Sequence, residues 1–256
     1  MSIRIAELHK AFGPKEVLRG FSLEVRVGAT AAIVGPSGSG KSVLLKHLVG
    51  LMRPDAGSVL VDGESVPDLG RRDLARFRRR VGYVFQFAAL FDSMTIGENV
   101  GMGLKRLPGW RADRIHERVN ECLALVDLEG MGERYPSQLS GGQKKRAGLA
   151  RAIAASPKYL LYDEPTTGLD PVTTSVIDEL ILRMRDELGV TGLVVTHDMT
   201  SAFRVADRIT LLHEGKARFT GTPAEVRVAR DDVLRGFVEG DPGLYYGLQG
   251  RGDHGP

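Results

Sequence analysis

A glycine-rich loop at residues 35–42 constrains the fold of this chain more than any other segment. The pattern G-x-x-x-x-G-K-[ST] is matched there by Gly35, Pro36, Ser37, Gly38, Ser39, Gly40, Lys41 and Ser42. An apolar run at residues 30–34 precedes the loop, and residues 41–51 carry apolar side chains at helical spacing. A buried strand, a glycine loop and a helix in this order predict a phosphate-binding loop in an α/β fold.

The chemistry of this loop predicts ATP and Mg²⁺ as ligands. Glycines let backbone N–H groups close around a phosphate, and the start of the following helix adds partial positive charge. We expect Lys41 to bridge the β- and γ-phosphate oxygens and Ser42 to ligate Mg²⁺. Every residue of the loop is therefore predicted to bind ATP.

A pair of carboxylates follows a second apolar run. Residues 159–162 lead directly into Asp163 and Glu164, which places both acids at the sheet edge where ligands bind in open α/β folds. We expect Asp163 to hold Mg²⁺ and Glu164 to polarise the attacking water as a general base. Taken alone, a solvated acidic pair at a strand end is an equally good interpretation, but the phosphate-binding loop favours the catalytic one.

The pentapeptide at residues 139–143 lies between these two features. Ser140 offers a hydroxyl, and Gly141 and Gly142 offer backbone amides without side chains. These groups form a second phosphate-binding element, and the loop at 35–42 does not need it to bind the phosphates of its own nucleotide. The pentapeptide therefore predicts that a second protomer contributes to the site.

The periodicity along the chain predicts three structural regions. Residues 3–8 and 21–27 alternate apolar and polar side chains, which favours antiparallel strands, and later short apolar runs alternate with helical patterns, which favours a parallel sheet covered on both faces. In the segment between these two regions, at about 87–156, apolar side chains recur with the helical period of 3.6 residues. We predict an α/β fold: a P-loop NTPase (RecA-like) core with an N-terminal antiparallel β subdomain and an inserted α-helical subdomain at about 87–156. The ATPase domain is expected at 1–240 and a C-terminal tail at 241–256.

Composition excludes few function classes. The net charge of +3 is too small to argue for nucleic acid, and the basic segment 71–80 favours a solvated helix face near anionic headgroups over a nucleic-acid site. The single Cys122 is predicted to be a packing residue. No apolar run approaches the ~18 residues of a spanning helix, and the N-terminus carries no signal core. We therefore expect a cytosolic chain, in which a membrane role needs another subunit.

The motifs and their order resemble the nucleotide-binding subunit of an ABC transporter over nearly the whole chain. The resemblance implies ATP hydrolysis coupled to transport, and a homodimer in which Ser140, Gly141, Gly142 and Gln143 bind the ATP held by the opposite subunit. We call residues 140–143 the signature segment. The catalytic residues implied are Glu164, His197 and Gln86.

The roles of four residues come from the resemblance alone. It implies that Gln86 senses Mg²⁺ and the nucleophile, that Asp170 is a cross-dimer contact in the ATP site, that His197 contacts the γ-phosphate and that Phe12 stacks on adenine, where the family usually has Tyr. A structural histidine at position 197 and a core phenylalanine at position 12 remain alternatives. The Mg²⁺ ligands implied are Ser42, Gln86 and Asp163.

Some stretches resemble one branch of the family, the ATPases of Mla/Mce-type lipid transporters. These are residues 85–95, 161–173, 194–199 and 233–240. The branch implies phospholipid transport through a separate permease of the Mla/Mce type with an MCE-domain lipid-binding protein, at the cytoplasmic face of the inner membrane. The alternative is the ATPase of a polar-solute (amino-acid-type) importer. A soluble ABC ATPase acting on DNA or ribosomes is disfavoured, because the chain carries one copy of each motif and no spare domain.

Overall fold

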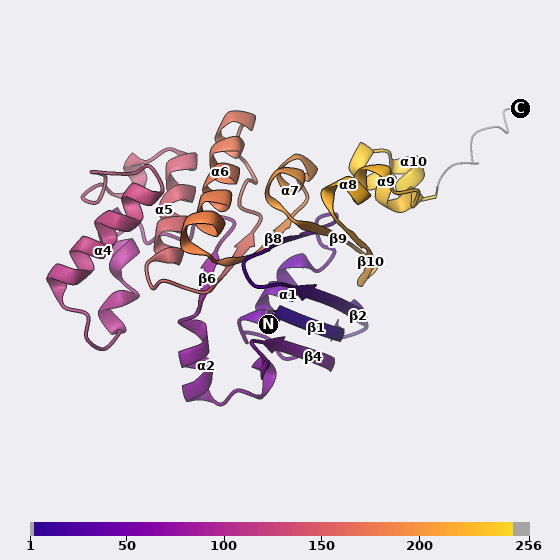
Figure 1. Cartoon of the computed structure of the whole chain (residues 1–256), viewed down its shortest axis with the longest axis horizontal. Helices are drawn as coiled ribbons and strands as arrows, with labels where there is room; N and C mark the ends of the chain where they lie inside the picture. The colour runs from indigo at the N-terminus through magenta and orange to yellow at the C-terminus, as the bar shows by residue number, and fades with distance from the viewer. Residues whose placement is uncertain (1–2, 248–256) are drawn as a thin grey trace, which may run out of the picture.

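The computed structural model describes residues 3–247 and contains two sheets (Figure 1). The central sheet is six-stranded with the order β10-β9-β3-β8-β7-β6. Its first five strands in sequence pair in parallel, and β10 adds to the edge in antiparallel fashion. The strands are β3 (Thr30–Val34), β6 (Val81–Val84), β7 (Tyr159–Asp163), β8 (Thr191–Thr196), β9 (Arg208–His213) and β10 (Lys216–Gly221).

The second sheet is antiparallel and confirms the predicted N-terminal β subdomain. Its order is β2-β1-β4-β5, formed by β1 (Ile3–Phe12), β2 (Lys15–Val25), β4 (Ala56–Val61) and β5 (Glu64–Ser65). The first two strands are longer than the alternating segments of the sequence. Between β4 and β5 the turn residues Asp62 and Gly63 both have positive φ, 51° and 81°, as a tight hairpin turn requires.

Helix α1 (Lys41–Leu48) lies between the two sheets. Leu44, Leu45 and Leu48 are fully buried, in a cluster that takes side chains from both sheets, such as Ile33 and Val59. The helix contacts β4 on one side and β7 and β8 on the other. This packing fixes the position of the N-terminus of α1, where the phosphate-binding loop ends.

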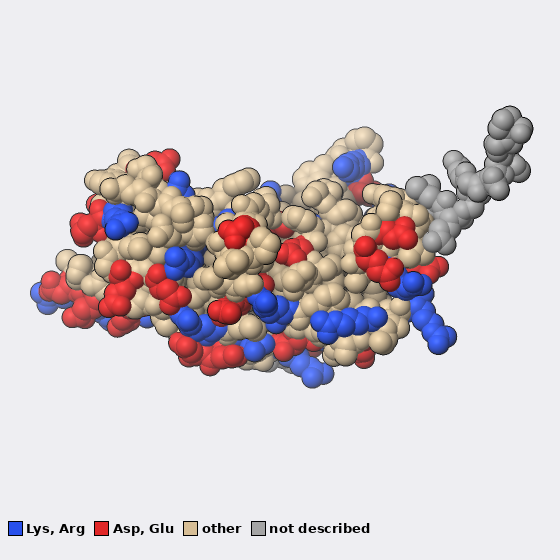
Figure 2. Space-filling view, turned by 90° about the horizontal axis from the view of Figure 1, so that it is seen from above, with Lys and Arg blue, Asp and Glu red and all other residues tan. Residues whose placement is uncertain are grey.

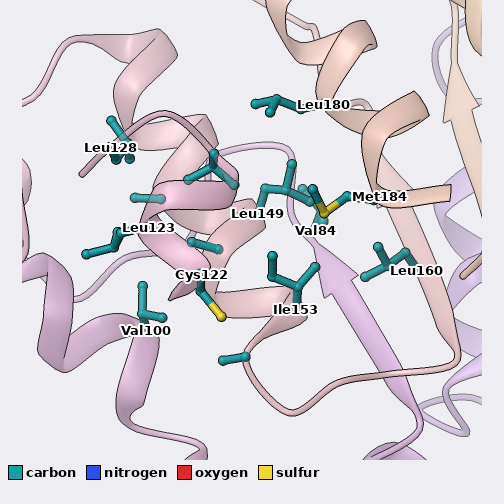
Figure 3. Packing of buried hydrophobic residues seen from close by; sticks show 14 of the residues in the cluster. Val84, Val100, Cys122, Leu123, Leu128, Leu149, Ile153, Leu160, Leu180 and Met184 are labelled. Atoms are coloured by element: carbon teal, nitrogen blue, oxygen red, sulfur yellow. The ribbon is translucent and has the colours of Figure 1, made fainter. Parts of the chain in front are cut away.

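The predicted helical insert is present between β6 and β7. It contains α3 (Ile96–Gly101), α4 (Ala112–Leu125) and α5 (Gly141–Ile153), with short 3₁₀ turns at Leu104–Arg106 and Pro136–Gln138. Leu123 of α4 packs in one buried cluster with Leu149 and Ile153 of α5 (Figure 3), and Cys122 of α4 is fully buried in the same cluster. Burial raises the pKa of its thiol to about 11. Cys122 is thus a packing residue, as the sequence predicts.

The described residues contain six further helices. They are α2 (Arg71–Arg78), α6 (Pro171–Leu188), α7 (Met199–Val205), α8 (Pro223–Val228), α9 (Asp232–Glu239) and α10 (Pro242–Tyr245), with a 3₁₀ turn at Val66–Asp68. Helices α6 and α7 lie on the opposite side of the sheet from α1 (Figure 1). On the face seen in Figure 2, acidic and basic side chains are interspersed. Among residues 3–247, no helix combines the length and the apolar character needed to cross a bilayer.

The expected tail begins with a helical turn. Helix α10 packs against α9, and a Cβ at Gly236 would lie 2.3 Å from the backbone nitrogen of Tyr245, so only glycine allows this approach. The proposed boundary between residues 240 and 241 falls between the two helices. Residues 248–256 of the tail lie outside the described part of the chain.

Candidate nucleotide-binding and catalytic site

The phosphate-binding loop runs from the end of β3 to the start of α1. Gly38 and Gly40 have φ of 78° and 106°, which favours glycine, and a Cβ at Gly35 would lie 2.6 Å from the carbonyl oxygen of Leu212 in β9. Gly40 is the N-cap of α1, and no side chain caps the helix there. The first amides of α1 are thus available to bind an anion.

Lys41 is buried beneath this loop. Its Nζ donates hydrogen bonds to the carbonyl oxygens of Gly35 at 2.8 Å and Pro36 at 3.1 Å. The same atom lies 3.2 Å from Oε1 of Glu164. The ammonium is therefore held by the loop backbone and by the acid at the end of β7, in the place predicted for phosphate binding.

Asp163 joins the loop to two neighbouring strands. Its Oδ1 accepts a hydrogen bond from Oγ of Ser42 at 2.8 Å, and its Oδ2 accepts one from the hydroxyl of Tyr83 at 2.8 Å. Burial and the nearby carboxylate raise the pKa of Tyr83 above its ordinary value. Ser42 and Asp163 present hard oxygen donors side by side, which is the chemistry that suits Mg²⁺.

Glu164 has an unusual backbone and a fully engaged carboxylate. Its φ is 50°, and the residue is 8% exposed. Oε2 accepts a hydrogen bond from Oγ1 of Thr167 at 3.0 Å and lies 2.8 Å from Nδ1 of His197. His197, which follows β8, is half exposed, and its predicted contact with the γ-phosphate stays a prediction.

A cleft of about 440 Å³ brings many of the predicted residues together. The predicted residues that line it are Ser37, Gly38, Gly40, Lys41, Ser42, Gln86, Glu164 and His197. They come from the phosphate-binding loop and from the carboxyl ends of β6, β7 and β8. Three further lining residues, Val17, Val43 and Thr167, carried no signal in the sequence.

Phe12 and Asp170 do not line the cleft. Phe12 is 46% exposed at the end of β1, so it is not a core residue, and Nζ of Lys10 lies 5.8 Å from its ring centroid. Asp170 is exposed and caps α6, where its Oδ1 accepts hydrogen bonds from the amides of Val172 and Thr173. The side-chain and backbone hydrogen bonds of Thr173 lower the pKa of Asp170. The roles predicted for both residues stay predictions.

The signature segment forms the exposed start of α5. Ser140 Oγ accepts a hydrogen bond from the amide of Gln143 at 3.2 Å, and Gln143 Oε1 accepts one from the amide of Ser140 at 2.9 Å, a reciprocal cap. A Cβ at Gly142 would lie 2.5 Å from Cγ2 of Thr173, whereas one at Gly141 would meet nothing within 4 Å. The segment does not line the cleft of its own chain.

Comparison with known proteins decides the family. Residues 18–167 match the family described as ABC transporter. The chain belongs to this family. Its members are ATPases that couple ATP hydrolysis to transport. This cassette also resembles solved ABC structures: it has a TM-score of 0.79 and 33% identity to a dimeric ATP-binding cassette in a post-hydrolysis state bound to ADP and Pi, over 86% of this chain and 98% of that one.

A second structure and three relatives extend the comparison. A cassette of the CbiONQ ABC transporter complex from Clostridium perfringens gives a TM-score of 0.82 at 30% identity, over 91% of this chain and 93% of that one. The sulfate/thiosulfate import ATP-binding protein CysA is 42% identical in Vibrio vulnificus (96% of this chain, 71% of the relative). It is 43% identical in Caulobacter vibrioides (93% and 70%) and 40% identical in Synechococcus elongatus (88% and 64%). The cassette thus spans about two thirds of the length of these relatives. Both structures confirm the predicted fold.

Proposed function

We propose that this cassette is the ATPase subunit of an ABC importer for a polar solute and acts on a separate permease at the cytoplasmic face of the membrane. The observation that carries the ATPase role is the contact of Glu164 with both Lys41 and His197 at the cleft. The solute class is supported by the 40–43% identity to sulfate/thiosulfate import proteins. These relatives support the alternative importer interpretation of the sequence better than lipid transport.

The site residues have separate roles in ATP hydrolysis. Lys41 and the first amides of α1 bind the phosphates, and Ser42, Asp163 and Gln86 would hold Mg²⁺, which supplies charge stabilisation when bound. Glu164 takes the proton of the attacking water. His197, within hydrogen-bond distance of Glu164, orients its carboxylate at the mouth of the cleft.

Two copies complete each site in this proposal. The cleft is formed without the signature segment, whose exposed amides and hydroxyl lie at the start of α5. In a two-fold symmetric dimer the same patch of each copy forms the interface, so a contact between the loop of one copy and the signature segment of the other occurs twice and generates two equivalent sites. ATP therefore binds between the loop at 35–42 of one copy and the signature segment of its partner.

The permease docks on the segment 85–91 in this proposal. Phe85, Phe87 and Phe91 are 42%, 84% and 51% exposed, and exposed aromatic side chains grouped in one segment mark protein interfaces. The segment contains Gln86. Binding of ATP is thereby linked to the position of the permease loops.

Lipid transport through an Mla/Mce-type permease is a second candidate, favoured by one feature of this segment. Polar amino-acid importers typically carry a Phe-Pro pair after the glutamine, whereas here Phe91 is followed by Asp92. The cassette does not contact the transported molecule in either case. The feature that distinguishes the two candidates therefore lies at the segment that faces the permease.

Purification of the native complex tests both candidates. Under the first proposal the cassette copurifies with a permease and a solute-binding protein, and sulfate or another polar solute stimulates ATP hydrolysis in proteoliposomes. An MCE-domain partner, together with stimulation by phospholipid alone, would replace this proposal with lipid transport.

A mixture of two inactive variants tests the shared site. Lys41→Ala disables the phosphate-binding loop, and Gly141→Asp places a carboxylate where the partner's γ-phosphate binds, at a position with space for it. Each variant alone is expected to be inactive. In an equal mixture half of the dimers combine the two and keep one intact site, so about a quarter of the wild-type activity returns. A mixture that stays inactive contradicts the shared site.

A further inference from the structure

Lys145 lies just after the signature segment on α5, and its ammonium is buried. The residue is 8% exposed, and burial lowers the pKa of the ammonium below its ordinary value. Nζ donates hydrogen bonds to two main-chain carbonyl oxygens, those of Gln86 and Glu164, the latter at 3.4 Å. These two residues follow different strands of the sheet and are both assigned to hydrolysis.

The bond to Glu164 supports a backbone conformation that the residue adopts only under constraint. A positive φ is unfavourable for a residue with a Cβ, yet φ of Glu164 is 50°. In this conformation its carboxylate reaches Nζ of Lys41 at 3.2 Å and Nδ1 of His197 at 2.8 Å. Lys145 binds the main-chain oxygen of the same residue and so holds the conformation that aims the carboxylate.

The bond to Gln86 is one of several between α5 and the loop that follows β6. Arg151, also on α5, donates hydrogen bonds to the carbonyl oxygens of Ala88 at 2.9 Å and Ala89 at 2.5 Å. Both alanines have positive φ, 58° and 49°. The loop is therefore anchored to α5 by these hydrogen bonds, and Lys145 is the side chain that also connects α5 to Glu164.

We propose that Lys145 is a positioning residue for ATP hydrolysis. It fixes Gln86 and Glu164 relative to the signature segment. A movement of α5 therefore changes the positions of both residues through the hydrogen bonds from Lys145 to their main-chain oxygens. The inference rests on the ATP hydrolysis of the family and does not depend on which molecule is transported.

Steady-state hydrolysis by the cassette assembled with its permease tests this role. Lys145→Met keeps the length of the side chain and removes the donors, and misplacing a catalytic group by a fraction of an ångström to about 1 Å lowers kcat by about ten- to a hundred-fold. The KM for ATP is expected to change by less than about two-fold, because no ATP contact is lost. Lys145→Arg retains donors and should recover most of the rate. Lys144→Met, at the preceding position of α5, is the matched control and should turn over normally.

A double substitution separates positioning from a merely structural role. If Lys145 acts in part through Gln86, the effects of Lys145→Met and Gln86→Ala on kcat are not multiplicative, and the double variant is faster than the product of the two single losses predicts. Independent, multiplicative losses would overturn the proposal. So would a wild-type rate in folded Lys145→Met or a loss of rate that only matches the unfolded fraction. Lys145→Leu, which also lacks donors, is a second variant in case methionine prevents folding, and a wild-type rate in it would also overturn the proposal. A wild-type complex without ATPase activity would instead count against the proposed function.

Discussion

Nζ of Lys41 lies 3.2 Å from Oε1 of Glu164, and the two side chains are 5% and 11% exposed. A buried ion pair is sensitive to the loss of either partner, because the remaining charge is left without its counterion. Here Lys41 also has two main-chain acceptors, Gly35 and Pro36. The pair therefore links the phosphate-binding group to the general base without making the position of Lys41 depend on Glu164 alone.

Glu164→Gln is expected to separate ATP binding from hydrolysis. The amide cannot accept the proton of the attacking water, so turnover falls by about 10²- to 10⁴-fold. Lys41 keeps its main-chain acceptors, so ATP binding persists and a dimer with trapped ATP accumulates. Phosphate release and size-exclusion chromatography with ATP measure the two effects. Glu179→Gln, at an exposed position of α6, is the control, and wild-type turnover by Glu164→Gln would exclude Glu164 as the base.

Tyr83→Phe is expected to weaken the response to Mg²⁺. The substitution removes the hydrogen bond that orients Oδ2 of Asp163, and loss of such a supporting bond costs about 10- to 100-fold in metal affinity. The Mg²⁺ concentration for half-maximal ATPase activity should rise, while the maximal rate at saturating Mg²⁺ changes little. An unchanged Mg²⁺ dependence would contradict a role of Tyr83 in orienting Asp163.

The catalytic motifs were predictable because each is local in the sequence. The loop at 35–42 and the acids at 163 and 164 each follow an apolar strand, so their flanks place them at the sheet edge without further information. Tyr83, Thr167 and Lys145 were not predicted. Tyr83 is 80 positions from Asp163, and the parallel register of β6 and β7 sets their contact, which a single sequence does not show.

The lipid assignment and the C-terminal tail show two further limits of prediction from the sequence. The assignment depended on short stretches of the chain, whereas the relatives compared over 88–96% of the chain are named as sulfate/thiosulfate import proteins. The start of the tail has no clear period in sequence. Its helix α10 forms through tertiary packing, since Gly236 lets the backbone of Tyr245 approach α9.

Two tyrosines of β7 should respond to removal of the hydroxyl with opposite signs. The hydroxyl of Tyr162 is buried without a hydrogen-bond partner among residues 3–247, so Tyr162→Phe is expected to raise the free energy of unfolding by about 1 kcal/mol. The hydroxyl of Tyr159 donates to Oδ1 of Asp62, so Tyr159→Phe should lower it by about 1 kcal/mol. Urea denaturation measures both, and a destabilised Tyr162→Phe would show that this hydroxyl has a partner.

Asp178, fully buried between α6 and α7, is expected to make stability fall as the pH rises. Burial raises its pKa from 3.8 to about 6, although Ser201 donates a hydrogen bond to Oδ1 and Arg204 lies 3.7 Å from Oδ2. Between these two values the folded state binds more protons than the unfolded state, so the free energy of unfolding decreases with pH. The penalty is absent below pH 3.8 and complete above about pH 6, where it amounts to about 3 kcal/mol at 1.36 kcal/mol per pKa unit.

Asp178→Asn retains an acceptor for Ser201 and should remove this decrease, so that the variant is the more stable protein at pH 7. Urea denaturation from pH 4 to pH 7 measures the difference, with Asp113→Asn at an exposed position of α4 as control, and a variant that keeps the wild-type slope would exclude Asp178 as its source.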